Sequence, residues 1–173
     1  MSKIKVLVSK EEIQRKTREL AERISRDYEG EELLLVGVLK GGFVFLADLC
    51  REITIPVSID FISVSSYGNS TVSSGVVRIL KDIDYDITGK HILIVEDLID
   101  TGLTLTYLKD LFAAKHCASV KLCTILDKPS RRKVPLEIDY KGIEIPDEFV
   151  IGYGLDYAEK YRNLPDVCVM AEK

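Results

Sequence analysis

The stretch V-E-D-L-I-D-T-G-L-T, from Val95 to Thr104, decides the fold of this chain. The apolar run His91–Val95 ends in two adjacent acids, Glu96 and Asp97, and a third acid, Asp100, precedes a turn rich in hydroxyls and glycine. Apolar residues then recur at helical spacing, at Leu105, Leu108, Leu111 and Phe112. The pattern predicts a buried strand, a polar loop and a helix, the unit with which α/β proteins hold phosphate. Three carboxylates beside such a loop indicate a divalent metal, a ribose diol, or both.

Composition limits the class of protein. A chain of 173 residues, 46% hydrophobic and 30% charged, is typical of one soluble domain spanning 1–173. No apolar stretch approaches the ~18 residues that span a membrane, and a charged segment follows Ile4–Val8, so neither a membrane anchor nor a signal peptide is expected. The net charge is −4 and cations alternate with acids, which argues against a nucleic-acid-binding face. We therefore expect a cytoplasmic protein.

The cysteines and histidines do not indicate a metal cluster. The four cysteines follow no metal or redox spacing, so we expect reduced and mostly buried thiols. His91 and His116 stand apart at the edges of predicted elements, and we expect both at the surface.

Hydrophobic periodicity predicts alternating strands and helices. A capping box beginning at Ser9 starts a first helix that Gly30 ends, and Phe43–Ile53 is a second helix. Short apolar runs predict further strands at Leu33–Leu39, Val57–Val64, Val76–Leu80, Ser119–Leu126, Phe149–Tyr153 and Val167–Met170. Fully apolar strands imply that both sheet faces are covered, so we expect an α/β fold with a twisted, mostly parallel sheet flanked by helices.

The polar residues that follow these strands predict where the site lies. Ligands of such sheets bind at the carboxyl ends of the strands. Lys40, Glu96, Lys128 and Asp156 each come just after a predicted strand, so we expect them to meet at one edge.

The 95–104 stretch resembles the phosphoribosyl-diphosphate (PRPP) signature of type I phosphoribosyltransferases. The segments 39–42 (L-K-G-G), 66–68 (S-Y-G), 127–129 (D-K-P) and 149–157 (F-V-I-G-Y-G-L-D-Y) occur in the order seen in hypoxanthine-guanine phosphoribosyltransferases, and Glu159 and 161–165 continue the match. The resemblance implies a type I phosphoribosyltransferase fold with a small hood formed by the terminal segments. It also implies a magnesium-dependent pentosyltransferase of purine salvage, a homodimer or homotetramer, which converts PRPP and hypoxanthine or guanine to IMP or GMP and pyrophosphate.

The same resemblance implies a role for each part of the central motif. Glu96 and Asp97 would hold the ribose hydroxyls and Mg²⁺, a ligand suited to oxygen donors. Asp100 would be the general base that takes the purine proton near N7. The 5′-phosphate would lie on the turn formed by Thr101, Gly102, Leu103 and Thr104. From the residues alone, this turn could be a plain helix cap, with Thr104 capping, and Asp100 a carboxylate that only favours the helix dipole.

Pyrophosphate binding is implied for three further positions. Lys40 and Gly41 would bind it through exposed backbone amides, at a peptide that is often cis in this family. Arg162 would add a forked cation, and Asp156 would ligate a second Mg²⁺. Without the resemblance, Arg162 could be a solvated helix arginine and Asp156 an N-cap for a short helix from Tyr157.

Base recognition and closure are implied for the remaining positions. Phe149 would stack on the purine, Lys128 would donate to its 6-oxo group, and the Val150 backbone would read the ring edge. Lone aromatics in strands are more often core residues, so Phe149 depends on the resemblance. The small, polar 65–75 segment would be a mobile active-site loop that contacts substrate through Ser66 and Tyr67, and a disordered connector is the alternative.

Two rival functions fit parts of the pattern. One is a catalytically silent regulator that keeps the PRPP motif and binds nucleic acid, although the intact Asp100, Lys128 and Arg162 argue against it. The other is an enzyme for another base, such as xanthine, orotate or uracil. Guanine, hypoxanthine and xanthine differ only at position 2, which the sequence leaves open.

Overall fold

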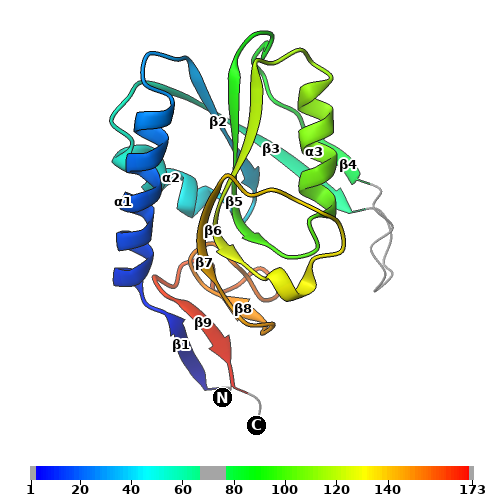
Figure 1. Cartoon of the computed structure of the whole chain (residues 1–173). Coiled ribbons are helices and arrows are strands. Elements are labelled where there is room, and N and C mark those ends of the chain that lie inside the picture. Colours follow the sequence, from blue (N-terminus) through cyan, green and yellow to red (C-terminus); the bar gives the residue numbers. More distant parts are fainter. Residues whose placement is uncertain (1–2, 67–76, 172–173) are drawn as a thin grey trace.

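A large mixed sheet forms the centre of the computed structural model, which describes residues 3–66 and 77–171 (Figure 1). Its strands are β2 (Leu33–Leu39), β3 (Val57–Ser66), β4 (Val77–Lys81), β5 (His91–Ile99), β6 (Ser119–Asp127) and β7 (Tyr140–Glu144). They lie in the order β4-β3-β2-β5-β6-β7, and only the β3–β4 pair is antiparallel. The predicted twisted, mostly parallel α/β sheet is therefore confirmed.

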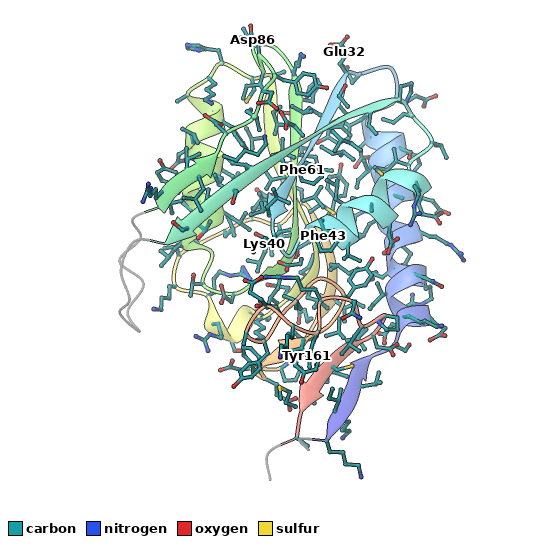
Figure 2. The ribbon with its side chains drawn as sticks, turned by 180° about the vertical axis from the view of Figure 1, so that it is seen from behind. Glu32, Lys40, Phe43, Phe61, Asp86 and Tyr161 are labelled. Atoms are coloured by element: carbon teal, nitrogen blue, oxygen red, sulfur yellow. The ribbon has the colours of Figure 1, made fainter. Side chains whose placement is uncertain are left out.

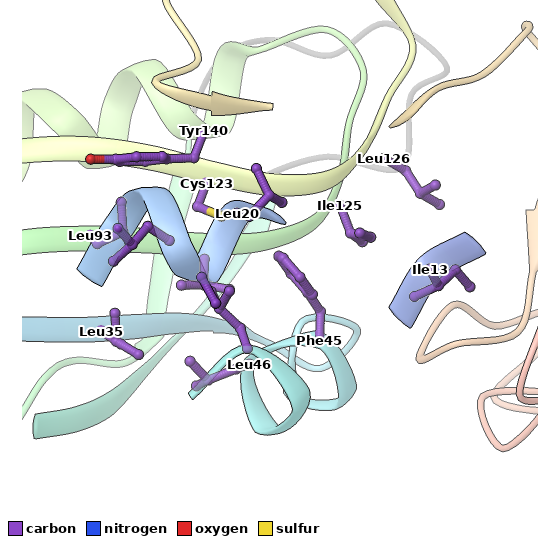
Figure 3. Close-up of a cluster of buried hydrophobic side chains, with 14 of the residues drawn as sticks. Ile13, Leu20, Leu35, Phe45, Leu46, Leu93, Cys123, Ile125, Leu126 and Tyr140 are labelled. Carbon is purple, nitrogen blue, oxygen red and sulfur yellow. The ribbon is translucent and has the colours of Figure 1, made fainter. Parts of the chain in front are cut away.

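Helices cover both faces of this sheet, as the apolar strands require. α1 (Lys10–Asp27) and α2 (Phe43–Glu52) lie on one face and α3 (Leu103–Ala113) on the other (Figure 1). Alternate residues of β2 separate the two cores: Leu33 and Leu35 pack in the cluster with α1 and α2, whereas Leu34 and Val36 pack in the cluster with α3. Figure 3 shows the first of these clusters, to which β2 contributes Leu35, α1 Leu20 and α2 Leu46.

A second, smaller sheet forms a hood beyond the carboxyl ends of the central strands (Figure 1). It consists of β1 (Ile4–Val8), β9 (Val167–Met170) and β8 (Val150–Ile151), paired antiparallel in that order. The first and last strands of the chain, β1 and β9, pair there, so the hood predicted from the terminal segments is confirmed.

Several predicted boundaries were wrong, because the extent of a strand depends on its backbone pairing and not only on its apolar sequence. β5 continues past Val95 to Ile99, since β6 pairs with it along this stretch. The expected strand at 149–153 is only two residues long, and Tyr140–Glu144 forms a strand that was not expected. Ser65 and Ser66, expected in a loop, are the last residues of β3. Residues 67–75 of the expected lid, including Tyr67, lie outside the described residues.

His91 was also placed wrongly. It is half-buried: its Nδ1 lies 2.6 Å from the Ser119 hydroxyl and its Nε2 3.3 Å from Glu31, and its ring packs edge-on against Tyr28. The four cysteines are free thiols, two buried and two half-buried. None of the helices in the described part of the chain combines the length and apolarity needed to cross a bilayer.

Candidate active site

A cavity of about 370 Å³ lies at the carboxyl ends of β2 and β5, the edge predicted for the site. In Figure 2, Lys40 lies at this end of the sheet, whereas Glu32 and Asp86 lie at the other. Predicted site residues from three separate segments line the cavity: Lys40, Gly41, Glu96, Asp97, Asp100, Thr101, Gly102, Thr104, Asp156 and Arg162. Leu103, Lys128, Phe149 and Val150 lie outside this lining.

Glu96 and Asp97 form an acidic pair near the carboxyl end of the strand β5. The Asp97 side chain is nearly buried and accepts a hydrogen bond from the Leu98 amide at 2.7 Å. Glu96 accepts one from the Asp97 amide at 3.0 Å. Burial, and then the adjacent Asp97 carboxylate, hold the pKa of Glu96 well above its usual range. Such a pair is suited to receiving a cation or a hydroxyl-rich ligand, which relieves the repulsion.

Glu96→Gln is therefore expected to stabilise the ligand-free protein. A carboxyl whose folded pKa is raised contributes stability below its unfolded pKa, near 4.5, and this stability is lost as the pH rises through the folded pKa. Glutamine does not ionise, so the advantage of the variant should grow with pH and reach about 2–4 °C in Tm at pH 8. Thermal unfolding from pH 4 to pH 8 measures it. The exposed Glu137→Gln is the control, and equal pH dependence in all three proteins would contradict the prediction.

The 39–42 loop is pressed against this acidic pair. The Leu39–Lys40 peptide is cis. A Cβ on Gly41 would overlap the Asp97 carboxylate, and a Cβ on Gly154 would overlap the Gly41 carbonyl oxygen. Only glycine at these two positions lets the loop lie between the acids and the 154–162 segment.

The turn after β5 aims the start of α3 at the cavity. Asp100 is exposed, and its Oδ1 accepts a hydrogen bond from the Thr101 amide at 2.6 Å. Gly102 has a positive φ of 82°, and the helix begins at Leu103. Thr104 does not cap the helix as suggested, since it lies within the first turn, where Thr101 Oγ1 is 3.4 Å from the Leu103 amide. The amino end of an 11-residue helix and its preceding amides suit an anion.

A network of charges closes the other side of the cavity. Arg162 donates to the Gly154 carbonyl at 2.7 Å and lies 3.4 Å from Asp156, and its buried Nε has no hydrogen-bond partner among residues 3–66 and 77–171. Glu159 lies 3.1 Å from Lys40 Nζ and 3.5 Å from Arg162, and the hydrogen bond from Lys40 lowers the pKa of Glu159. Glu159 was not predicted as a site residue.

Both structural alternatives for this segment were wrong. A bridge between Tyr157 and Lys160 takes the place of the suggested short helix, so Asp156 is no helix cap and Arg162 no helix residue.

Lys128, Phe149 and Val150 do not line the cavity, although the Lys128 amide donates to the carbonyl of Ile99, which does. Lys128 directly follows β6 and is only 7% exposed, and this burial lowers its pKa. Phe149 is 60% exposed and packs edge-on against Tyr157 at 5.8 Å, so it is not a core aromatic. Val150 belongs to β8, which is an edge strand of the hood in the described part of the chain, so one side of its backbone faces no strand.

The sequence did not predict an ion pair between Asp127 and Arg132, which lies next to the turn that carries Asp100. Asp127 is buried at the end of β6 and forms an ion pair with Arg132, whose Nε also donates to the Asp100 carbonyl at 3.1 Å. The one available signal was the D-K-P-S-R-R run, in which an acid directly follows a buried strand.

The acids of the cavity do not form a complete metal site by themselves. Within residues 3–66 and 77–171, no three His, Cys, Asp or Glu side chains are grouped so that they could hold an ion. Mg²⁺, however, is usually held by one or two carboxylates with water and substrate phosphates. The oxygen donors of Glu96, Asp97 and Asp156 fit that kind of binding.

Comparison with known proteins gives consistent matches. Residues 5–158 match the phosphoribosyl transferase domain family. The hypoxanthine-guanine phosphoribosyltransferase of Bacillus subtilis is 54% identical over 166 residues, 96% of this chain and 92% of the relative. That of Streptococcus thermophilus is 50% identical over 169 residues, 98% and 94% of the two chains. A crystal structure of a Bacillus anthracis hypoxanthine-guanine phosphoribosyltransferase, with HEPES in its active site, gives a TM-score of 0.94 at 56% identity, over 99% of this chain and 100% of that one.

Proposed function

Because this chain belongs to the phosphoribosyltransferase family, we propose that it transfers the 5-phosphoribosyl group of PRPP to hypoxanthine or guanine, which gives IMP or GMP and pyrophosphate. The observation that carries the proposal is the cavity at the end of β5, where the acidic pair, Asp100 and the amino end of α3 lie together. Lys128 lies buried beside this cavity, and lysine distinguishes a 6-oxo from a 6-amino purine because it only donates.

The residues of the central motif would divide the substrate between them. Thr101 and the amides of the 101–104 turn would bind the 5′-phosphate, with the positive end of α3 behind them. Glu96 and Asp97 would accept hydrogen bonds from the two ribose hydroxyls. Their negative charge also favours the positive charge that develops on the ribose in an oxocarbenium-like transition state.

The departing pyrophosphate would be received on the opposite wall. Lys40, Gly41 and Arg162 supply two cations and backbone amides around that part of the cavity. Asp97, and Asp156 on the other side, would hold Mg²⁺, which when bound would neutralise part of the diphosphate charge.

The purine would lie between the cavity and the hood. Asp100, which is exposed, would take the purine proton near N7. Phe149 offers an exposed aromatic face for stacking, and the free edge of β8 at Val150 offers backbone groups to the ring. The ammonium of Lys128 would donate to the 6-oxo group.

The direct test is a panel of bases assayed with PRPP and Mg²⁺. We expect nucleotide formation with hypoxanthine and guanine and at least about 10²-fold lower kcat/KM with adenine, orotate and uracil. Adenine has an amino group where the buried donor requires an acceptor, and orotate and uracil are single pyrimidine rings that lack the imidazole part of a purine. Xanthine in the same panel measures the contribution of position 2. A protein that turns over no purine and shifts RNA or DNA in a gel would instead be the silent regulator.

The proposal also covers the cellular location and the oligomeric state of the protein. We expect a cytoplasmic protein, in keeping with its four free thiols. A homodimer or homotetramer is supported by Phe43, which is 45% exposed on α2 although its neighbours Phe45 and Leu46 are buried. Light scattering measures the assembly, and a monomer at micromolar concentration would contradict it.

A further inference from the structure

The 127–133 segment donates hydrogen bonds to three successive backbone carbonyls, those of residues 99, 100 and 101. The Lys128 amide donates to the Ile99 carbonyl at 2.9 Å, and the Lys133 amide donates to the Thr101 carbonyl at 3.0 Å. Between them, Arg132 Nε donates to the carbonyl of Asp100 at 3.1 Å. The central bond is the one made by a side chain, so substitution can remove it while the two backbone bonds remain.

The Arg132 guanidinium is itself fixed by a buried partner. Its NH2 group pairs with Asp127, whose side chain is 3% exposed, while the Arg132 side chain is 18% exposed. The short 3₁₀ turn Pro129–Arg131 reverses the chain and brings residue 132 back to residue 127. A buried carboxylate without a partner is costly, so this pair constrains the guanidinium to one place.

The Arg132 side chain also packs against the turn that leads into α3. A Cβ on Gly102 would meet Arg132 Cδ at 3.1 Å, so Arg132 runs along the turn that leads from Asp100 into α3. Asp100 is exposed, and its carboxylate accepts a hydrogen bond from the adjacent Thr101 amide. The geometry of this carboxylate therefore depends on how firmly its main chain is held.

We propose that Arg132 is a positioning residue for Asp100: anchored by Asp127, it holds the Asp100 carbonyl and so aims the Asp100 carboxylate at the purine next to Lys128. The inference rests on the proposed function, in which Asp100 accepts the purine proton. Arg132 touches neither the base nor the sugar in this account. Its loss should slow the proton-transfer step and leave PRPP binding nearly unchanged, because a small misplacement of a reacting group costs up to about 10²-fold in rate.

Two variants remove the bond to Asp100 without leaving an unpaired buried charge. Arg132→Lys keeps a cation for Asp127 but lacks the separate Nε and NH2 donors that let arginine contact both partners. The double variant Asp127→Asn/Arg132→Gln replaces the ion pair by a neutral amide pair. Arg131→Lys is the matched control, because Arg131 is the adjacent arginine and pairs with Asp147 at the surface.

The measurement is the single-turnover rate of IMP formation at saturating PRPP and hypoxanthine, with Tm and PRPP affinity recorded for each protein. Single turnover is needed because product release can mask a slower chemical step. We expect both variants to be about 10–100-fold slower than wild type, with PRPP affinity within about threefold, and the control to be unchanged.

Combination with Asp100→Asn separates positioning from a general structural role. If Arg132 acts through Asp100, then Arg132→Lys adds less than about threefold to the loss caused by Asp100→Asn, because the two substitutions remove one function. Multiplicative losses, or single-turnover rates of both variants within threefold of wild type, would overturn the proposal. Failure of the proposed function is seen separately, as a wild-type protein that forms no IMP.

Discussion

Asp100→Asn is expected to lower turnover by about 10²–10⁴-fold while PRPP binding stays within about threefold of wild type. Asparagine retains an oxygen that can accept the 2.6 Å hydrogen bond from the Thr101 amide, so the turn before α3 should keep its shape. An amide cannot take up the purine proton, and the loss should therefore fall on the chemical step. Steady-state kinetics and calorimetric titration with PRPP measure the two effects.

Asp110→Asn is the control for this prediction, because Asp110 is an exposed aspartate on α3, the helix that follows the Asp100 turn. It should leave both turnover and PRPP affinity unchanged. Near-normal turnover of Asp100→Asn would remove Asp100 as the base and leave it as a carboxylate that only shapes the turn.

Lys128→Met is expected to weaken purine binding by about 10–100-fold and PRPP binding by less than about threefold. The lysine is only 7% exposed, and methionine replaces its chain with one of similar length that cannot donate to a 6-oxo group. The loss should therefore appear in the KM for hypoxanthine and guanine. Initial rates with each substrate varied in turn separate the two affinities.

Lys133→Met is a suitable control. Lys133 is an exposed lysine of the same loop, and its hydrogen bond to the Thr101 carbonyl is made by its backbone amide, which methionine retains. Equal losses for purine and PRPP in Lys128→Met would argue that this lysine supports the fold of the loop rather than the recognition of the base.

The central fold could be predicted because its signals are local. The apolar runs of β2, β5 and β6 and the helical spacing of α1 and α3 determine which residues are buried, whatever lies next to them. Boundaries were harder to place. Glu96–Ile99 continue β5 because β6 offers backbone partners there, and a pattern of hydrophobicity contains no information about partners.

The site divides in the same way. Glu96, Asp97 and Asp100 stand out in the sequence because acids that follow an apolar, buried run are costly unless they have a function. Arg132 and Glu159 do not stand out, because arginine and glutamate in a loop are ordinary surface residues. Their contacts with Asp127 and Lys40 depend on how the chain folds back, through the 3₁₀ turn after Lys128 and the segment after Gly154.

The most direct test of the account is the balance of products from one incubation of the purified protein with hypoxanthine, PRPP and Mg²⁺. We expect every hypoxanthine consumed to yield one IMP and one pyrophosphate, because in the proposed reaction the purine accepts the phosphoribosyl group and pyrophosphate is the leaving group. Pyrophosphate released without IMP would show hydrolysis of PRPP instead. Unchanged hypoxanthine and PRPP would contradict the central claim.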